Sequence, residues 1–397
     1  MTTFVFNQKP TKALPLDPGY TPMILGNMAF LKAVNESGIK QEVRIAIVRS
    51  NDQIATTTTY IFGQEANQFE ANYLYIERLV KSLLWLKGGY KIIFGGDLLV
   101  GEALKKAYSF NGERAFDQKF MANVYQEDFI VEIVSLEDVP QTNEISKPMG
   151  RHLDGCRIGF DAGGSDRKVS AVVNGESIYS EEIVWHPKIN SDPSYHYAGI
   201  LDSMKRAASK LPRVDAIGVS SAGIFIDNKV AVASLFLKVP QDVFDEKVRN
   251  MYFDIQKDMG NVPLEVVNDG DVTALAGAMS LESNNVLGIA MGTSEAAGYV
   301  DSLGNITGWL NELAFVPVDY NKHSLIDEWS LDYGCGVKYF SQDSVIKLAK
   351  PAGIVLDESL SPAEKLKVVQ TLHKKNDERA IEIFRTIGVY LGYTIAY

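Results

Sequence analysis

One local pattern occurs twice in the sequence, and this repeat limits the folds that the chain can adopt. Each copy has a short apolar strand, a turn built from glycine and hydroxyl residues, and two further strands. The first copy begins at Arg157 and the second at Val286. In the first copy, helices and buried strands then alternate as far as Leu281, which is typical of an α/β sheet. The repeat therefore predicts a duplicated α/β fold whose two lobes face each other across a cleft, a favoured place for ligands.

The apolar periodicity divides the chain into three units. We expect an N-terminal α+β domain over 1–150, which ends in a polar linker at 141–151, a first lobe over 151–283 and a second lobe over 284–397. In the N-terminal domain we expect strands at 41–49, 54–62, 91–94 and 129–134, and helices at 70–86 and 101–108. In the first lobe we expect strands at 157–160, 169–173, 177–185, 216–220 and 264–267, and helices at 197–210, 242–259 and 272–281. In the second lobe we expect strands at 286–290, 297–300 and 307–310, and helices near 336–348, 362–373 and 377–396.

Composition and charge exclude several classes of function. The chain has 397 residues and a net charge of -11, so a basic surface for nucleic acid is not expected. The sequence has no run of about 18 apolar residues, so no membrane helix is expected. Its start lacks the pattern of a signal peptide. The two cysteines, Cys156 and Cys335, do not suggest a disulfide framework. We therefore expect a cytoplasmic protein that acts on small molecules. We also expect a homo-oligomer, such as a dimer.

The first turn, Asp161–Lys168 (DAGGSDRK), has the residue types of a phosphate-binding loop. Gly163 and Gly164 allow backbone N–H groups to approach a phosphate closely. Ser165 and Lys168 add a hydroxyl donor and a cation, and the Asp161 carboxylate can hold Mg²⁺. The same residues also suit a tight turn between two strands, with no ligand.

The segment Val267–Asp271 (VNDGD) places acidic residues between a buried strand and a helix. A side chain at this point enters the cleft of an α/β sheet, where the carboxylate of Asp269 could accept a proton from a substrate hydroxyl. Alternatively, Asp and Asn here serve as the N-cap of the following helix. The two interpretations are compatible, since Asp271 could cap the helix while Asp269 reacts.

Two further segments belong to the second copy of the repeat. In 290–298 (AMGTSEAAG), Gly292, Thr293 and Ser294 could donate hydrogen bonds to a phosphate, although small residues also suit a plain hairpin. In 311–315 (NELAF), Glu312 could accept hydrogen bonds from two sugar hydroxyls, although an exposed loop glutamate is the alternative.

Taken in this order and spacing, the motifs resemble the ROK (repressor, ORF, kinase) family of sugar kinases and sugar-responsive regulators. The resemblance covers roughly 155–397 and includes the segment Gly218–Gly223 (GVSSAG), which is similar to a stretch that borders the sugar. The segment 267–278 (VNDGDVTALAGA) is the best match. The resemblance implies the two-lobed actin-like ATPase fold, which is ribonuclease H-like, and transfer of the ATP γ-phosphoryl group to a sugar in the manner of a glucokinase.

The resemblance also assigns roles to individual residues. It implies Asp269 as the catalytic base and Mg²⁺ near Asp161. The nucleotide phosphates would be bound by Asp161, Gly163, Gly164, Ser165, Lys168, Gly292, Thr293 and Ser294. The sugar would be bound by Gly223, Asn268, Glu312 and Gln342.

The sequence departs from the family pattern where the family has a zinc site. Phe315 stands at the position of a zinc-binding histidine, and Cys335 is the one cysteine left in the following segment. Because one thiolate cannot form a tetrahedral zinc site, we expect no zinc, and we expect Phe315, Tyr333 and Phe340 to pack in its place. Gln342 replaces a carboxylate that binds the sugar. These changes leave open a second hypothesis, a non-catalytic protein that binds sugar for regulation.

The last predicted helix, 377–396, ends within an apolar pattern and lacks a polar last turn. In the family, a strand and a glycine-rich loop that binds adenosine follow this helix. We therefore expect that the sequence is truncated, with impaired nucleotide binding as the alternative.

Overall fold

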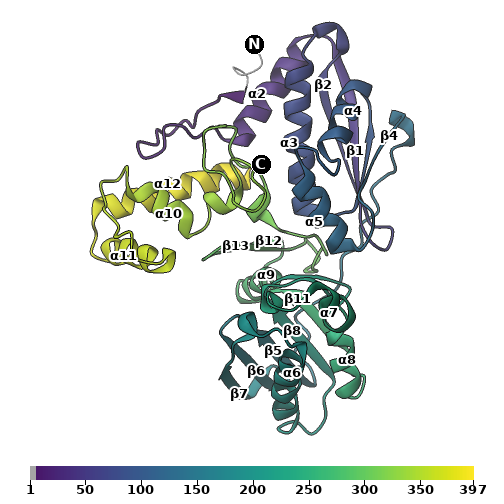
Figure 1. Ribbon diagram of the computed structural model, residues 1–397, viewed down its shortest axis with the longest axis vertical. Coiled ribbons are helices and arrows are strands. Elements are labelled where there is room, and N and C mark those ends of the chain that lie inside the picture. Colours follow the sequence, from purple (N-terminus) through teal and green to yellow (C-terminus); the bar gives the residue numbers. More distant parts are fainter. Residues whose placement is uncertain (1–5) are drawn as a thin grey trace.

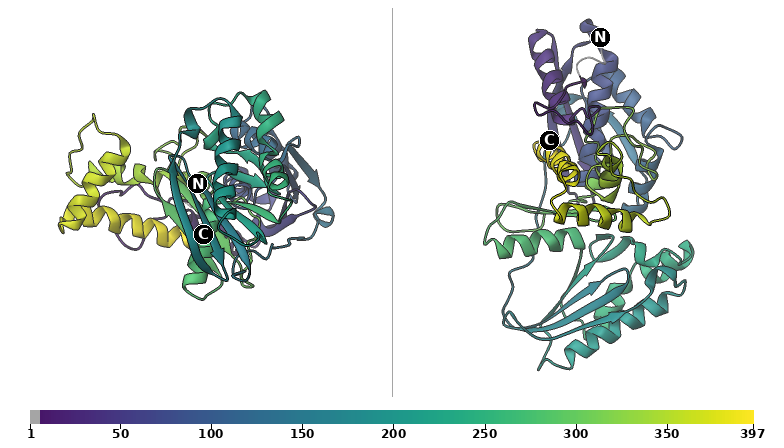
Figure 2. Two further views of the ribbon diagram at one scale, coloured as in Figure 1. Left: turned by 90° about the horizontal axis from the view of Figure 1, so that it is seen from below. Right: turned by 90° about the vertical axis from the view of Figure 1, so that its left-hand side faces the viewer.

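The computed structural model describes residues 6–397. Residues 1–5, which belong to the start of the chain that we compared with a signal peptide, lie outside the described part. The names N-terminal domain, first lobe and second lobe refer to the units predicted over 1–150, 151–283 and 284–397. Figures 1 and 2 show the N-terminal domain at one end of a long molecule and the sheet of the first lobe at the other. The helices α10, α11 and α12 of the second lobe lie beside the N-terminal domain (Figure 1).

The N-terminal domain is built on a four-stranded sheet with the order β2-β1-β3-β4, in which only β3 and β4 are parallel. Alternating apolar residues of β1, including Val43, Ile45 and Ile47, are fully buried against the helices. The four predicted strands and two predicted helices are confirmed, while α2 and α5 were not predicted. The elements are α2 (Met23–Glu36), β1 (Lys40–Val48), β2 (Ile54–Phe62), α3 (Phe69–Lys87), β3 (Lys91–Gly95), α4 (Leu98–Ala107), α5 (Ala115–Tyr125) and β4 (Ile130–Val134).

The first lobe contains a five-stranded sheet with the order β11-β8-β5-β6-β7. Strands β5, β6 and β7 form an antiparallel meander, and β8 and β11 continue the sheet parallel to β5. One face carries alternate side chains such as Ile158, Phe160 and Val219, which are buried among apolar residues of α6 and α8. The strands are β5 (Cys156–Ala162), β6 (Asp166–Val173), β7 (Glu176–Val184), β8 (Ala216–Ser221), β9 (Ile224–Ile226), β10 (Lys229–Val232) and β11 (Leu264–Asn268).

The helices of the first lobe agree with the prediction, with one correction. The single helix expected over 242–259 is divided by a π-helical turn, Phe244–Val248, into the short α7 (Gln241–Val243) and α8 (Met251–Asp258). The other two helices of this lobe are α6 (Pro193–Ala208) and α9 (Asp269–Ser280).

The second copy of the repeat is less complete than predicted. Its first two strands, β12 (Val286–Met291) and β13 (Glu295–Val300), form an antiparallel hairpin. The expected third strand at 307–310 is wrong, because these residues leave the hairpin and run beside the end of α3, where Leu310 N donates to Lys87 O. The helix expected near 336–348 is a 3-10 turn followed by α10 (Gln342–Ala349), and α11 (Pro362–Lys374) and α12 (Glu378–Ile395) follow it.

A buried cluster of charges joins the N-terminal domain to the second lobe. Asp332, in the loop before α10, accepts hydrogen bonds from Arg78 and from Lys81, both on α3. Arg114 also pairs with this carboxylate at 2.9 Å. Because these cations are at most 2% exposed, the three positive charges together hold the pKa of Asp332 far below its usual range.

The charge of the cluster is balanced by two more acids of the N-terminal domain. Glu77 pairs with Arg114 at 2.5 Å, and Asp117 accepts a hydrogen bond from the indole of Trp85 at 2.6 Å. Three cations therefore face three carboxylates in the dry interface. Removing one partner of such a buried network leaves an uncompensated charge, which is strongly destabilising.

We predict that Asp332→Asn lowers the free energy of unfolding by about 3 to 5 kcal/mol, because Arg78, Lys81 and Arg114 then lose their shared counter-charge. Chemical denaturation followed by circular dichroism measures this change. The control, Glu382→Gln, removes an exposed pair with Arg385 and should change stability by less than about 0.5 kcal/mol. Equal effects of the two substitutions would contradict the role given to Asp332.

Candidate active site at the edge of the first-lobe sheet

Parallel strands of the first lobe bring the predicted acidic residues to one edge of the sheet. Asp161 is the penultimate residue of β5 and lies opposite Ser220 of β8, and Asn268 ends β11 opposite Ser221. Asp269 follows directly as the first residue of α9. The negative charge of Asp161 contributes to raising the pKa of Asp269, after the larger effect of burial. The two carboxylates therefore lie close enough to interact.

Asn268 forms the N-cap of α9 and also binds the predicted sugar segment. Its Oδ1 accepts from the backbone N–H of Gly270 at 2.7 Å, and its Nδ2 donates to the carbonyl of Gly223 at 2.7 Å. Each end of the amide keeps one further hydrogen-bonding position for a ligand. Since Asn268 caps the helix, the suggestion that Asp271 does so is wrong, and the carboxylate of Asp269 makes only a longer contact with Gly270, at 3.1 Å.

Three more carboxyl groups, from both lobes, lie behind Asp269. Asp271 is on α9, Glu295 is on β13, and Glu312 precedes a 3-10 turn of the second lobe. Burial raises the pKa of Asp271 to about 7, that of Glu312 to about 7 and that of Glu295 to about 8. Asp269 and Asp271 add to the effect on Glu312, so the predicted sugar ligand of the second lobe approaches the predicted base of the first.

Glu295 is a site residue to which the sequence analysis gave no role. It is 6% exposed, and its Oε2 has no hydrogen-bond partner in the described structure. Gly336 allows this close approach, because a Cβ there would stand 2.7 Å from Glu295 Oε2. A lone acidic residue in a strand of small apolar residues, 295–300 (EAAGYV), was the available signal.

The first predicted phosphate loop forms a tight turn between β5 and β6. Lys168 is bound to Asp166 and lies 3.8 Å from Asp161, while the Ser165 hydroxyl donates to Asp166 at 2.9 Å. The cation and the hydroxyl are therefore occupied within the turn, as in a plain hairpin. Lys188 is a further cation that sequence reasoning missed, and its Nζ stands 2.9 Å from where a Cβ on Gly164 would lie.

The second predicted phosphate loop joins β12 to β13. Gly292 has open space around its Cα, and its carbonyl accepts a hydrogen bond from the backbone N–H of Gln342, at 2.9 Å. Thr293 and Ser294 are exposed at the same turn. Gln342 thus lies at the start of α10 beside this loop. Among residues 6–397 no hydrogen bond or ion pair joins it to Glu312, the other predicted sugar ligand of the second lobe.

A cavity of about 320 Å³ opens beside these residues, and all three units of the chain line it. The first lobe contributes Gly223 and Asn268, which are predicted sugar ligands, together with Asp271. The second lobe contributes Thr307 and Trp309. The N-terminal domain contributes Arg49, Asn51, Gln53 and Tyr125. Asp269 stands in the sequence between two lining residues, Asn268 and Asp271, so this cavity is the candidate substrate site, and we call it the acidic cleft.

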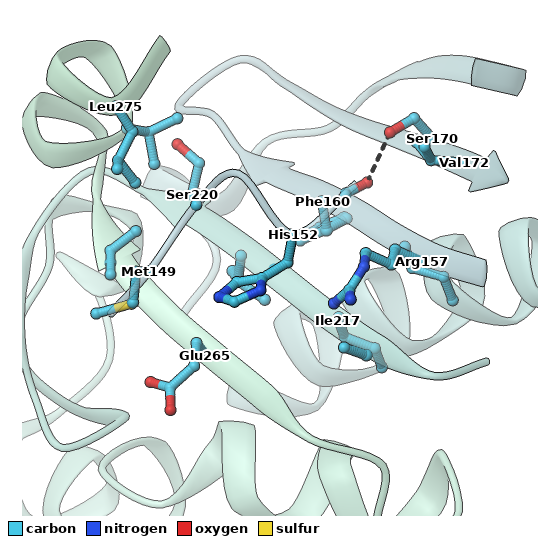
Figure 3. A pocket seen from close by; sticks show the side chains of 18 of the residues that line it. Met149, His152, Arg157, Phe160, Ser170, Val172, Ile217, Ser220, Glu265 and Leu275 are labelled. Carbon is cyan, nitrogen blue, oxygen red and sulfur yellow. Dashed lines mark hydrogen bonds between the residues drawn. The ribbon is translucent and has the colours of Figure 1, made fainter. Parts of the chain in front are cut away.

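A larger cavity, of about 660 Å³, lies on the face of the first-lobe sheet that α6 and α8 do not cover (Figure 3). Gly159 and Gly218, which have no side chain, are among its lining residues. Leu275 of α9 stands at one side (Figure 3). His152 and Arg157 project into the same space opposite Glu265 (Figure 3). The cavity reaches Asp161 and Lys168 but contains none of the predicted sugar ligands.

Where the family pattern has zinc ligands, around Phe315 and Cys335, this chain has aromatic side chains and the buried charge cluster. Phe315 stacks on Trp85 with ring centroids 4.2 Å apart, whereas Phe340 belongs to the separate core of the C-terminal helices. The expectation that Phe315, Tyr333 and Phe340 pack on one another is therefore wrong. Tyr333 instead lies under the guanidinium of Arg78, and burial raises the pKa of the Cys335 thiol to about 11.

The carboxylates suit a magnesium ion that arrives with a nucleotide. Among residues 6–397, no three His, Cys, Asp or Glu side chains form a group that could hold a metal ion by themselves. Mg²⁺ in nucleotide sites needs only one or two carboxylates, because phosphate oxygens and waters complete its shell. Asp161 provides an oxygen ligand of this type at the sheet edge.

Comparisons with known proteins find likeness only among solved structures. No protein-family model matches the sequence, and no curated protein matches it. The ROK hexokinase of Thermus thermophilus is similar over 57% of this chain and 72% of its own, with 14% identity and a TM-score of 0.44. A ROK glucokinase of Streptomyces griseus, solved with glucose and AMPPNP, is similar over 60% and 77%, with 19% identity and a TM-score of 0.42.

A ROK family transcriptional regulator, described as a homolog of the E. coli MLC protein, is also similar, over 64% of this chain and 63% of its own, with 19% identity and a TM-score of 0.46. These structural neighbours belong to the family that the sequence motifs resemble. Because every one of these TM-scores lies below 0.5, the function is argued below from the geometry of the acidic cleft. In the described part of the chain, no helix is both long and apolar enough to cross a lipid bilayer.

We predict that the buried carboxyl of Glu295 makes stability depend on pH. Its pKa is raised to about 8 in the folded chain, against about 4.3 when unfolded, so the folded state holds this proton more tightly. Stability then falls as the pH rises between these values. Glu295→Gln should therefore be more stable than the parent chain at pH 8, by up to about 5 kcal/mol, since each unit of pKa difference is worth about 1.4 kcal/mol.

Chemical denaturation at pH 5 and pH 8 checks this prediction, with Glu358→Gln as the control because Glu358 is 99% exposed. The advantage of Glu295→Gln should shrink at pH 5, and Glu358→Gln should show none at either pH. A pH-independent effect of Glu295→Gln would show that the carboxyl does not hold a proton at neutral pH.

Proposed function

We propose that this chain phosphorylates a sugar, a hexose or a derivative of one, with ATP as the donor and Asp269 as the general base. One observation supports this most directly. Asp269 follows the carboxyl end of β11, one of three parallel strands, and is half-buried and free of any ion pair in the described residues, while its neighbours Asn268 and Asp271 line the acidic cleft. That is where ligands bind in α/β sheets, and a hydroxyl placed there could give its proton to the carboxylate.

The environment of Asp269 suits proton acceptance. Burial and the charge of Asp161 raise its pKa toward neutrality, and a base whose pKa lies nearer the working pH drives proton transfer better. The sugar hydroxyl would lose its proton to Asp269 as its oxygen attacks the γ-phosphorus, and ADP would leave with the electron pair of the broken bond between the γ-phosphorus and the β–γ bridging oxygen. Asn268 and the carbonyl of Gly223 hold the floor of the cleft in place through their mutual hydrogen bond.

The two hairpin turns are the proposed nucleotide side of the site. Mg²⁺, bound with ATP near Asp161, would offset charge on the transferred phosphoryl group. Lys168 pairs with Asp166 in this structure, but its ammonium has three N–H donors and its side chain is about half exposed, so it can also donate to a phosphate.

A second candidate, sugar binding without catalysis, is favoured by one specific observation. In this structure the cation and hydroxyl of the first turn bind Asp166, and the second turn binds Gln342 through its backbone. If these internal contacts persist when ATP is offered, the cleft still binds sugar but no phosphoryl group moves.

We predict that Asp269→Asn lowers kcat for sugar phosphorylation by about 10² to 10⁴, the usual contribution of a general base. Sugar affinity should stay within about threefold, because the amide keeps the shape of the side chain. Coupled measurement of ADP release with a panel of hexoses, together with calorimetric titration of the sugar, provides both quantities. The control is Asp258→Asn, whose carboxylate accepts from Tyr197 at the protein surface.

Two outcomes decide between the candidates. Sugar binding without ADP release in the parent chain supports the non-catalytic candidate. Phosphoryl transfer that survives Asp269→Asn at the parent rate contradicts the assignment of the base.

A further inference from the structure

The N-terminal domain forms one wall of the acidic cleft. The turn between β1 and β2 reaches the first lobe, where the amide of Asn51 donates to Asp227 at 2.8 Å. Lys147 of the linker pairs with the same carboxylate at 3.0 Å. The turn is closed by Arg49 N donating to the carbonyl of Gln53, at 2.8 Å. These contacts hold the side chain of Arg49 at the boundary of the cavity that also contains Asn268.

Arg49 is held firmly but is not fully satisfied. It is 4% exposed, and it donates to the carbonyl of Gly308 at 2.8 Å and to Glu144 at 2.6 Å. Its Nε–H has no hydrogen-bond partner in the described structure. An unmade hydrogen bond of a buried charged group is costly, so a ligand acceptor that entered the cleft and reached Nε would complete the hydrogen bonds of Arg49.

The charges around Arg49 leave room for such an acceptor. Glu144 is shared, because it also accepts from the indole of Trp309 at 2.8 Å and pairs with Lys87 at 3.4 Å. Arg49 and Lys87 therefore share the single negative charge of Glu144. Burial, with the neighbouring charge of Arg49 as a smaller contribution, lowers the pKa of Lys87 in spite of Glu144. A ligand oxygen that carries partial or full negative charge would offset part of the excess positive charge of Arg49 and Lys87.

We propose that Arg49 is a specificity-determining residue, which selects sugars whose substituent presents a carbonyl or carboxylate oxygen to its Nε–H. The proposal rests on the proposed sugar site of the acidic cleft. It gives the N-terminal domain a role in substrate selection, since no other residue of that domain brings a buried, unpaired donor to this cavity among residues 6–397. The carbonyl could belong to an N-acyl group or to a hexuronic acid.

The test is calorimetric titration of the chain, without nucleotide, with four sugars on the same ring: a hexose, its 2-amino form, its N-acetyl form and its uronic acid. We expect one of the two carbonyl-bearing sugars to bind at least about tenfold tighter than the hexose and the amino sugar. The variant Arg49→Lys keeps the charge near Glu144 but loses the Nε–H, so this preference should disappear while hexose affinity stays within about threefold.

The control is Arg44→Lys on β1, the strand that leads to Arg49, where Arg44 pairs with the partly exposed Glu42 outside the cavity. It should keep the preference of the parent chain. Thermal unfolding of each variant shows whether the fold is retained, and a merely structural Arg49 would change all four affinities equally.

The proposal is overturned if the parent chain shows no preference for a carbonyl-bearing sugar, if Arg49→Lys keeps that preference, or if none of the four sugars binds. The proposed phosphorylation fails separately. A preference that depends on Arg49, in a chain that releases no ADP with ATP and the preferred sugar, supports Arg49 and contradicts the kinase. ADP release by the parent chain, together with an unchanged sugar preference in Arg49→Lys, supports the kinase and contradicts the role proposed for Arg49.

Discussion

The carboxylate of Asp332 is the contact on which the arrangement of the domains depends. Three buried cations of the N-terminal domain converge on it. The segment before it brings Glu312 near Asp269 and Asp271, and the segment after it places Gln342 at the second hairpin turn. Because breaking such a buried pair is strongly destabilising, the network holds this loop of the second lobe against α3 of the N-terminal domain.

The same interface accounts for the departures from the ROK pattern. Where that pattern has zinc ligands, this chain has Phe315 stacked on Trp85 and Cys335 close to Lys81, with the thiol kept protonated by burial. Aromatic packing and ion pairs can fix a loop as a metal does, through contacts that lie far apart in the sequence. The order of the cleft therefore depends on the N-terminal domain.

The sequence was sufficient where local patterns decide the structure. It predicted that Asp161 lies at the end of one strand and that Asp269 follows another, because apolar strands with small-residue turns define the edge of an α/β sheet. The roles given to these residues stay predictions. The sequence was insufficient where distant residues meet. Arg49 and Glu295 reach the candidate site only through tertiary contacts, and the strand expected at 307–310 is wrong because the end of α3 offers its carbonyls to that segment instead. The helix α5 was missed because it buries Asp117, which breaks the apolar period.

The central claim is that the sugar binds in the acidic cleft with the N-terminal domain as one wall. Hydrogen–deuterium exchange with saturating sugar tests it most directly. The account predicts slower exchange at once in three segments that line the cleft: 49–53, 223–228 and 306–310. Slowed exchange confined to 148–153 and 275–279, which border the larger cavity, would contradict it, as would a bound sugar that leaves 49–53 unchanged.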